Sequence, residues 1–275
     1  MTRSSDPRLL RRIEAMGVRA TERFWGLMPP EVAKRLRPRT ARMGDAFLTL
    51  AAASDALRMN RVIGLGHDGL AQEAMIDRIV AFYRAAKLRR FSVMVSPGPQ
   101  AARISRWLIA RGLTRHGGHC LLVREGRRTI PPVRSEVRVV RAKLEHADAI
   151  LAIHERCFAL PVSRRSWFRA ALASSRHEQY LALVGSTPVG AGALQVDRGL
   201  AWIGGGATLT RWRRRGAHAA LIAARLRRAA RLGCRWMWVE TAAPVPGRPA
   251  GSRRNLLRMG FEEVGVKPIF VWHER

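Results

Sequence analysis

The residues best suited to chemistry lie in one short segment, 207–221, which reads Ala-Thr-Leu-Thr-Arg-Trp-Arg-Arg-Arg-Gly-Ala-His-Ala-Ala-Leu. An extended apolar stretch before it predicts a strand, and the apolar spacing after Gly216 predicts a long helix. The first N–H groups of a helix lack partners within the helix, and the helix dipole is positive there. A phosphate binds to such N–H groups, and glycine lets the backbone approach it closely. The segment therefore predicts a site for a phosphorylated ligand.

Three adjacent arginines, Arg213, Arg214 and Arg215, strengthen this prediction, because guanidinium groups add charge-assisted hydrogen bonds to a polyanion. The alternative is a helix whose first turn happens to be basic. Cations at a helix N-terminus oppose the dipole by a few tenths of a kcal/mol each. A bound anion would offset this repulsion, so the cluster of arginines favours a ligand site.

The patterns around this segment predict the elements that position it. Period-two alternation indicates strands, and apolar residues spaced three or four apart indicate helices. The expected strands are 137–142, 179–184, 190–197, 201–209, 235–240 and 263–272, and the expected helices are 145–158, 164–175, 214–232 and 253–259. Their order, βααβββαβαβ, predicts an α/β fold with a mixed sheet flanked by helices.

The first half of the chain shows a similar order of patterns, which predicts an internal repeat. An offset of 144 residues aligns 84–88 with 228–232 and 92–95 with 236–239. A second short helix follows in each half and ends in a glycine suited to a left-handed helix cap, namely Gly112 and Gly260. Two unrelated α/β domains are the alternative.

A domain boundary is expected between the two halves. Pro131 and Pro132 interrupt the alternating segments and oppose both a helix and a central strand. We therefore expect domains at 1–130 and 136–275.

The basic segment resembles the cofactor signature of the GCN5-related N-acetyltransferase (GNAT) superfamily, Gln/Arg-x-x-Gly-x-Gly/Ala after a strand. Arg213, Gly216 and His218 occupy the three signature positions, and His218 departs from Gly/Ala. Thr210 stands where many members have proline. The resemblance covers roughly residues 137–275. It implies a tandem protein of two GNAT-like domains, each a mixed sheet flanked by helices.

The resemblance implies acetyl-CoA as co-substrate and no metal. Main-chain N–H groups around the start of the helix would hold the pyrophosphate, and the end of the preceding strand would line the pantetheine arm. Asn255 matches a position that often hydrogen-bonds this arm, although it could also be an exposed helical asparagine. The expected cofactor-binding residues are Thr208, Leu209, Thr210, Arg213, Arg214, Arg215, Gly216, Ala217, His218, Ala219 and Asn255.

The first half lacks these features. The same offset places Gln72 opposite Gly216 and Glu73 opposite Ala217, while 69–71 replaces the three arginines. An acidic first turn without glycine would repel a pyrophosphate. We expect this half to be structural or to shape the acceptor cleft.

The chemistry implied is direct attack of an amine on the thioester. Main-chain N–H groups near Thr208 would stabilise the anionic oxygen. Glu240 ends the strand beside the cofactor and is the candidate catalytic base, acting through water; it could equally bind the amine electrostatically or cap the next segment. Many family members use a tyrosine as general acid near Asn255, but this sequence has Arg253 there, and an arginine does not donate a proton at neutral pH. Water would then protonate the leaving thiolate, or transfer would be slow.

Composition limits the alternatives. A hydrophobic fraction of 47% over 275 residues is enough for two packed cores, and no run of about 18 apolar residues could span a membrane. Three widely spaced cysteines suit a reducing compartment, which favours the cytoplasm. The sequence specifies no oligomeric state.

The formal net charge of +30 would attract polyanions, including nucleic acid. The basic residues are spread along the chain with no basic tail, so an arginine-rich solvated surface is the simpler interpretation.

The leading hypothesis is an acetyl-CoA-dependent N-acetyltransferase acting on a small-molecule or peptide amine. A catalytically weak acyl-CoA-binding regulator is the second, and a nucleic-acid-binding module is the third and is not expected.

Overall fold

The computed structural model describes residues 6–159, 165–174, 177–247 and 250–274. The chain forms two compact units, which are treated separately below. Unit 1 is Met1–Cys120 with Gly265–Arg275, and unit 2 is Leu121–Val264. Among the described residues, no helix combines the length and the apolar character that crossing a bilayer requires.

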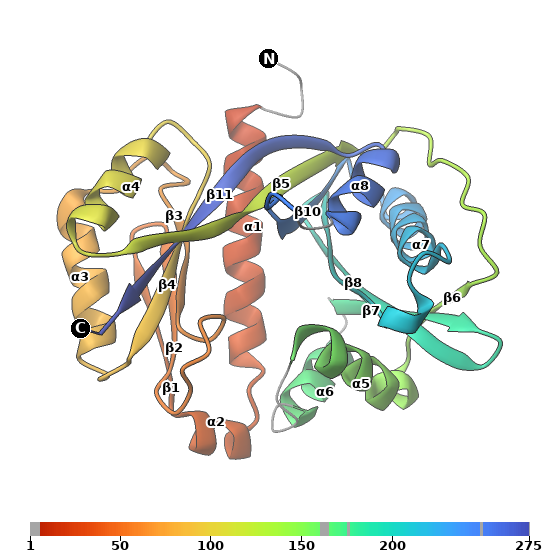
Figure 1. Cartoon of the computed structure of the whole chain (residues 1–275), viewed down its shortest axis with the longest axis horizontal. Coiled ribbons are helices and arrows are strands. Elements are labelled where there is room, and N and C mark those ends of the chain that lie inside the picture. Colours follow the sequence, from red (N-terminus) through yellow and green to blue (C-terminus); the bar gives the residue numbers. More distant parts are fainter. Residues whose placement is uncertain (1–5, 160–164, 175–176, 248–249, 275) are drawn as a thin grey trace. The chain divides into compact units, whose positions relative to one another are not determined.

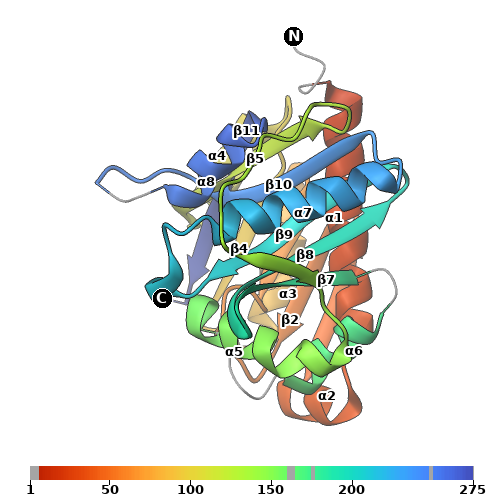
Figure 2. The same ribbon diagram turned by 90° about the vertical axis from the view of Figure 1, so that its right-hand side faces the viewer.

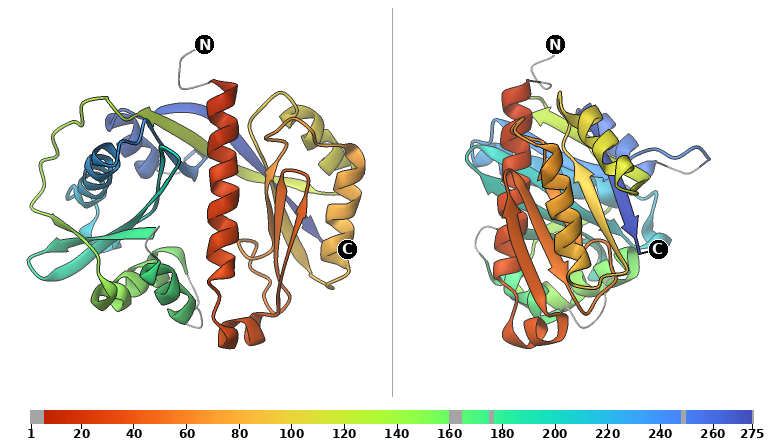
Figure 3. Two further views of the ribbon diagram at one scale, coloured as in Figure 1. Left: turned by 180° about the vertical axis from the view of Figure 1, so that it is seen from behind. Right: turned by 90° about the vertical axis from the view of Figure 1, so that its left-hand side faces the viewer.

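Unit 1 is a sheet with helices on both faces. Its strands run in the order β1-β2-β3-β4-β11-β5, and β3 and β4 are parallel. Helices α3 and α4 cover one face and α1 covers the other, as Figure 1 and the reverse view in Figure 3 show. Its elements are α1 Pro7–Gly26, α2 Pro30–Leu36, β1 Pro38–Met43, β2 Ala46–Ala51, β3 Arg61–Leu65, α3 Glu73–Arg84, β4 Arg90–Val95, α4 Ala101–Ala110, β5 Thr114–Glu125 and β11 Glu262–His273.

Unit 2 contains the basic segment. Its strands run in the order β5-β10-β9-β8-β7-β6, with β9 and β10 parallel and the pairs from β6 to β9 antiparallel. Helix α7 lies along the sheet (Figure 2). Its further elements are β6 Arg138–Arg141, η2 Leu144–His146, α5 Ala147–Phe158, α6 Arg165–Ala173, β7 His177–Val184, β8 Thr187–Asp197, β9 Leu200–Thr208, η4 Thr210–Trp212, α7 Ala217–Arg231, β10 Trp236–Ala242 and α8 Gly251–Arg258.

The mixed α/β fold predicted from the sequence is confirmed, and so are the two helix ends. Gly112 and Gly260 have φ of 79° and 81°. In each case the N–H of the residue after the glycine bonds back to the helix, Leu113 to Leu108 and Phe261 to Leu256, both at 3.1 Å. These are the bonds of a Schellman cap, which only a left-handed residue permits without strain.

The compact units differ from the predicted ranges 1–130 and 136–275 at their ends. Residues 269–273 of β11 pair antiparallel with 90–94 of β4, so the last strand adds to the sheet of unit 1. The alternating pattern of 263–272 identifies a strand, but main-chain hydrogen bonds decide which neighbour it takes. The strand was therefore predictable, whereas its place in unit 1 was not.

The two units share an order of elements. In unit 1 it is β3-α3-β4-α4-β5, and in the C-terminal part of the chain it is β9-α7-β10-α8-β11. Helices α3 and α7 begin at Glu73 and Ala217, the offset of 144 residues found in the sequence. This correspondence supports the repeat, which stays a prediction.

Candidate functional site

The basic turn connects β9 to α7. Strand β9 ends at Thr208, a short 3-10 turn covers Thr210–Trp212, and α7 begins only at Ala217. The predicted helix bounds of 214–232 were therefore wrong at the start. Arg214 and Gly216 have φ of 66° and 77°, in the left-handed region, so the arginines precede the helix instead of forming its first turn.

Packing within the protein requires a glycine at position 216. A Cβ at this position would lie 2.9 Å from Cβ and Oγ of Ser135 and 3.1 Å from the carbonyl oxygen of Arg134. The Ser135 hydroxyl donates to the carbonyl of Arg215 at 2.9 Å. The segment before β6 thus packs against the turn, and a side chain at 216 would push it away.

A cavity of about 890 Å³ opens at this turn, and all its lining residues belong to unit 2. The end of β9, the turn, the first residues of α7, and α8 form its walls, together with 131–134 and the end of α5. Eight of the predicted cofactor-binding residues line it: Thr208, Arg213, Arg214, Gly216, Ala217, His218, Ala219 and Asn255.

Three predicted residues have other contacts. The Leu209 N–H donates to the carbonyl of Val189 at 3.0 Å, and its side chain packs against the core. Thr210 begins the 3-10 turn. The Arg215 guanidinium lies 5.0 Å from the Trp212 ring centroid, and its Nη1 is 3.8 Å from a carboxylate oxygen of Glu136. None of the three lines the cavity.

Two polar atoms in the cavity wall are buried without a hydrogen-bond partner. They are Oγ1 of Thr208 and Nε1 of Trp212. Leaving a buried polar group unpaired costs about 1–3 kcal/mol, so such atoms are rare unless a ligand meets them. Trp212 was not among the cofactor-binding residues predicted from the sequence. Its place directly before Arg213 was the available signal.

The cavity is strongly basic. Five arginines line it, namely Arg134, Arg213, Arg214, Arg254 and Arg258. Among the described lining residues there is no aspartate or glutamate. Because these arginines line one cavity at the N-terminus of α7, the site suits a ligand carrying several phosphates.

His218 and Asn255 bind each other. The Asn255 amide Nδ2 donates to Nδ1 of His218 at 3.1 Å, so Asn255 is engaged rather than an exposed helical asparagine. Burial, with the nearby charge of Arg225, lowers the pKa of His218 to about 4. The imidazole is therefore neutral at pH 7 and places its second nitrogen towards Gly206, whose Cβ would lie 3.0 Å from Nε2.

Glu240 lies on β10, half-buried, and is not part of the cavity wall. The ladder between β9 and β10 pairs Trp236–Trp238 with Leu200–Trp202, and Glu240 stands two residues beyond it. Trp236 and Trp238 are buried core residues. Arg253, in the neighbourhood of the family's tyrosine, pairs with Glu263 at 2.6 Å. The catalytic role of Glu240 stays a prediction.

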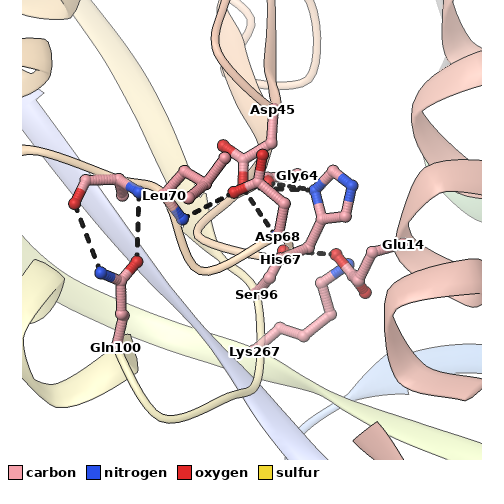
Figure 4. Close-up of polar contacts among 10 residues, drawn as sticks. Glu14, Asp45, Gly64, His67, Asp68, Leu70, Ser96, Gln100 and Lys267 are labelled. Atoms are coloured by element: carbon pink, nitrogen blue, oxygen red, sulfur yellow. Dashed lines mark hydrogen bonds and ion pairs between the residues drawn. The ribbon is translucent and has the colours of Figure 1, made fainter. Parts of the chain in front are cut away.

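The corresponding loop of unit 1 is held by hydrogen bonds to side chains of the same unit (Figure 4). The His67 Nδ1 donates to the carbonyl of Gly64 at 2.7 Å, and the N–H of Asp68 donates to Asp45 Oδ2 at 3.1 Å. Burial and the neighbouring Asp68 raise the pKa of Asp45 to about 6. Glu73, at the start of α3, pairs with Arg111 at 3.0 Å. This acidic, internally bonded loop contrasts with the basic turn of unit 2.

The comparisons place this geometry in a known class. Residues 147–261 match the model of the acetyltransferase (GNAT) family, so this part of the chain is a GNAT domain. Among the described residues, no group of three or more His, Cys, Asp or Glu side chains is arranged to hold a metal ion.

Solved structures share the fold at low sequence identity. The chain is similar to a GCN5-related N-acetyltransferase from Kribbella flavida, with a TM-score of 0.62 and 17% identity over 94% of this chain and 95% of that one. It is similar to a GCN5-related N-acetyltransferase from Sphaerobacter thermophilus, with a TM-score of 0.63 and 14% identity over 85% and 82%. It is also similar to a tandem GNAT protein from the clavulanic acid biosynthesis pathway, with a TM-score of 0.62 and 15% identity over 88% of this chain and 86% of that one. No curated protein matches the sequence.

Proposed function

We propose that the protein is an N-acetyltransferase that transfers an acetyl group from acetyl-CoA to a small-molecule or peptide amine in the cytoplasm. The observation that carries this proposal is the basic cavity at the N-terminus of α7, within a GNAT domain. Its arginines, its main-chain N–H groups and its two unpaired polar atoms together match a long ligand with a diphosphate end.

Different residues of the cavity would bind different parts of acetyl-CoA. Main-chain N–H groups from Arg214 to Ala219 would hold the pyrophosphate, and the arginines would neutralise its charge. Thr208 Oγ1 and Trp212 Nε1 would bond the arm between the phosphates and the thioester. Acetyl-CoA supplies an acetyl group activated as a thioester. Main-chain N–H groups at the end of β9 would stabilise the negative charge that develops on its oxygen.

The two halves would have different tasks. We assign acetyl transfer to 136–275 and a structural or acceptor-shaping role to 1–130. The acidic loop of unit 1 supports this division. Asp68 and Glu73 stand where the basic turn and the start of α7 stand in unit 2, and Asp45, from the turn between β1 and β2, accepts a hydrogen bond from the Asp68 N–H.

Thiol release from acetyl-CoA tests the enzyme proposal. The full chain should release coenzyme A steadily with at least one member of a panel of small amines and peptide N-termini. Arg213→Ala with Arg214→Ala should weaken coenzyme A binding by at least tenfold, because two guanidinium contacts are lost. Arg227→Ala with Arg231→Ala, on the same helix away from the cavity, is the matched control. Tight binding without thiol release for any amine contradicts catalysis.

A catalytically weak acyl-CoA-binding regulator is the second candidate, and one observation favours it. Among the described residues of the cavity wall there is no carboxylate, tyrosine or lysine, and its histidine has a pKa near 4. Burial raises the pKa of Cys157, which also lines the cavity. A general base must therefore come from elsewhere in the chain, and a regulator would need none. Binding of coenzyme A that changes no acceptor would support this candidate.

A further inference from the structure

A bulge interrupts the ladder between β8 and β9 beside the cavity. Ala191 pairs with Ala207 and Ala193 pairs with Gly204, so Gly205 and Gly206 together oppose the single residue Gly192. Gly205 has a φ of 61°, in the left-handed region. A bulge takes main-chain groups out of the regular ladder, and those groups need other partners. Gly206 lines the cavity.

From α7, a buried arginine meets the bulge. Arg225 is 1% exposed, and its Nη1 donates to the carbonyls of Gly204 at 2.8 Å and Ala193 at 3.0 Å. Its Nε donates to the carbonyl of Leu221 at 2.9 Å. Burial lowers the pKa of Arg225 to about 9, so the side chain stays charged at pH 7.

The hydrogen bonds that Arg225 makes in the described part of the chain all go to main-chain carbonyls rather than to a carboxylate. Burying a charge costs free energy unless hydrogen bonds compensate it, and main-chain carbonyls supply those bonds here. Gly192 makes room for it, since a Cβ there would lie 2.7 Å from the guanidinium carbon.

From α5, a histidine meets the same bulge. His154 is 3% exposed, and its Nε2 donates to the carbonyl of Gly205 at 3.1 Å. Burial lowers the pKa of His154 to about 4, so the ring is neutral and carries one N–H. The rings of Phe158 and Phe168 pack on it at centroid distances of 5.4 and 5.3 Å, which fixes the direction of that N–H.

We infer that Arg225 and His154 clamp the glycine bulge and act as positioning residues for the acetyl-transfer site. Three consecutive glycines have wide conformational freedom, so the bulge needs external bonds to keep one geometry. The clamp holds the carbonyls of Gly204 and Gly205. Because the Gly205 carbonyl shares one planar peptide with the Gly206 N–H, the clamp also fixes the direction of that N–H, at a residue that lines the cavity. Donors that are fixed in advance stabilise a developing oxyanion far better than mobile ones. The inference rests on the proposed function.

The vibration of the thioester carbonyl tests the clamp without turnover. Infrared difference spectra would be recorded for the full chain with acetyl-CoA labelled with ¹³C at the acetyl carbonyl. In the natural protein the bound carbonyl band should lie at lower frequency than the free band, because aligned N–H groups polarise it. Arg225→Met and His154→Leu should lose at least half of that shift, while the Kd for coenzyme A changes less than about threefold. His154→Gln, which keeps an N–H donor, should restore the shift.

Two further variants serve as a control and as a second test of the clamp. Arg228→Met removes an arginine from α7 that pairs with Glu178 at 2.8 Å, away from the bulge, and should leave the band unchanged. Gly192→Ala displaces the Arg225 guanidinium without removing it, and should broaden or shift the band even if Arg225→Met does not fold. Unchanged bands in the clamp variants, or an equal loss in Arg228→Met, overturn the clamp alone. A natural protein that binds no acetyl-CoA overturns the proposed function as well.

Discussion

At the scale of single residues, the unpaired atoms Thr208 Oγ1 and Trp212 Nε1 give the first prediction. Thr208→Val keeps the shape of its side chain and removes only the polar atom, whereas Trp212→Phe removes the indole N–H together with part of the ring system. Because neither atom has a partner among the described residues, thermal stability should stay equal or rise in Thr208→Val. Coenzyme A should bind about 5- to 12-fold more weakly, since a hydrogen bond contributes about 1–1.5 kcal/mol. Thermal melts and calorimetric titration measure both effects.

Tyr83→Phe is the control for this prediction. The Tyr83 hydroxyl donates to the carbonyl of Thr49 at 3.0 Å within the core of unit 1. Its loss should lower the free energy of unfolding by about 1 kcal/mol without changing coenzyme A binding. If Thr208→Val destabilises the protein as much as this control and binds coenzyme A normally, the two atoms do not contact the ligand.

Gly216 gives the second prediction. Gly216→Ala places a Cβ against Ser135 at a φ of 77°, and should destabilise unit 2 by about 1–2 kcal/mol and weaken coenzyme A binding. Gly216→Asp adds a carboxylate to the same steric change, so its further loss of affinity measures repulsion of the phosphates. Equal affinities for the two variants in calorimetry would place the diphosphate away from this turn.

At the scale of elements, a buried ion pair joins α1 to β11. The Lys267 Nζ lies 2.8 Å from Oε1 and 2.9 Å from Oε2 of Glu14, and the Ser96 hydroxyl donates to the same carboxylate at 2.6 Å (Figure 4). Both charged side chains are almost fully buried. This pair fixes the last strand of the chain against the first helix of unit 1.

The third prediction follows from that pair. Lys267→Met alone leaves a buried carboxylate unpaired and should destabilise unit 1 by about 3–5 kcal/mol. Glu14→Gln with Lys267→Met removes both charges and keeps an acceptor for Ser96, so most of that loss should be recovered. Denaturant unfolding of the two single variants and the double variant gives the coupling free energy between Glu14 and Lys267. Simple addition of the two losses would show that the charges act independently.

The sequence predicted the elements well where a local pattern decides them. Gly112 and Gly260 marked two helix ends because a left-handed cap favours glycine. The left-handed conformation of Arg214 was not predictable, since a residue other than glycine with a positive φ is uncommon and arginine carries no local signal for it. Arg225 shares the buried face of α7 with Leu221 and Ala229, and that spacing was a usable signal. In a chain so rich in arginine, the signal was easily taken for surface charge.

At the scale of the whole molecule, the two units should respond to acid in opposite directions. In unit 2, loss of solvent contact lowers the pKa values of three histidines, His154, His177 and His218, from 6.5 to about 4. A histidine whose pKa is lower in the folded state than in the unfolded state leaves the folded state fully stable above pH 6.5. The folded state loses stability as the pH falls from 6.5 towards 4. In unit 1 the pKa of Asp45 is raised to about 6 by burial and by Asp68, with His67 on its other side. An acid with a raised pKa stabilises at low pH and loses that stability as the pH rises from 3.8 to 6.

The fourth prediction is therefore that the stabilities of the two units diverge as the pH falls from 7 to 5. Each histidine makes unit 2 less stable by up to about 1.4 kcal/mol per pH unit, whereas Asp45 offsets acid loss in unit 1. Hydrogen exchange followed by mass spectrometry, corrected for intrinsic rates, should show α7 and β9 opening at pH 5 before α3 and β4. Asp45→Asn removes the titrating carboxyl, so it should stabilise unit 1 at pH 7 and abolish its gain on acidification. Parallel loss of protection in both units, unchanged by this substitution, would mean that these buried groups do not control the acid response.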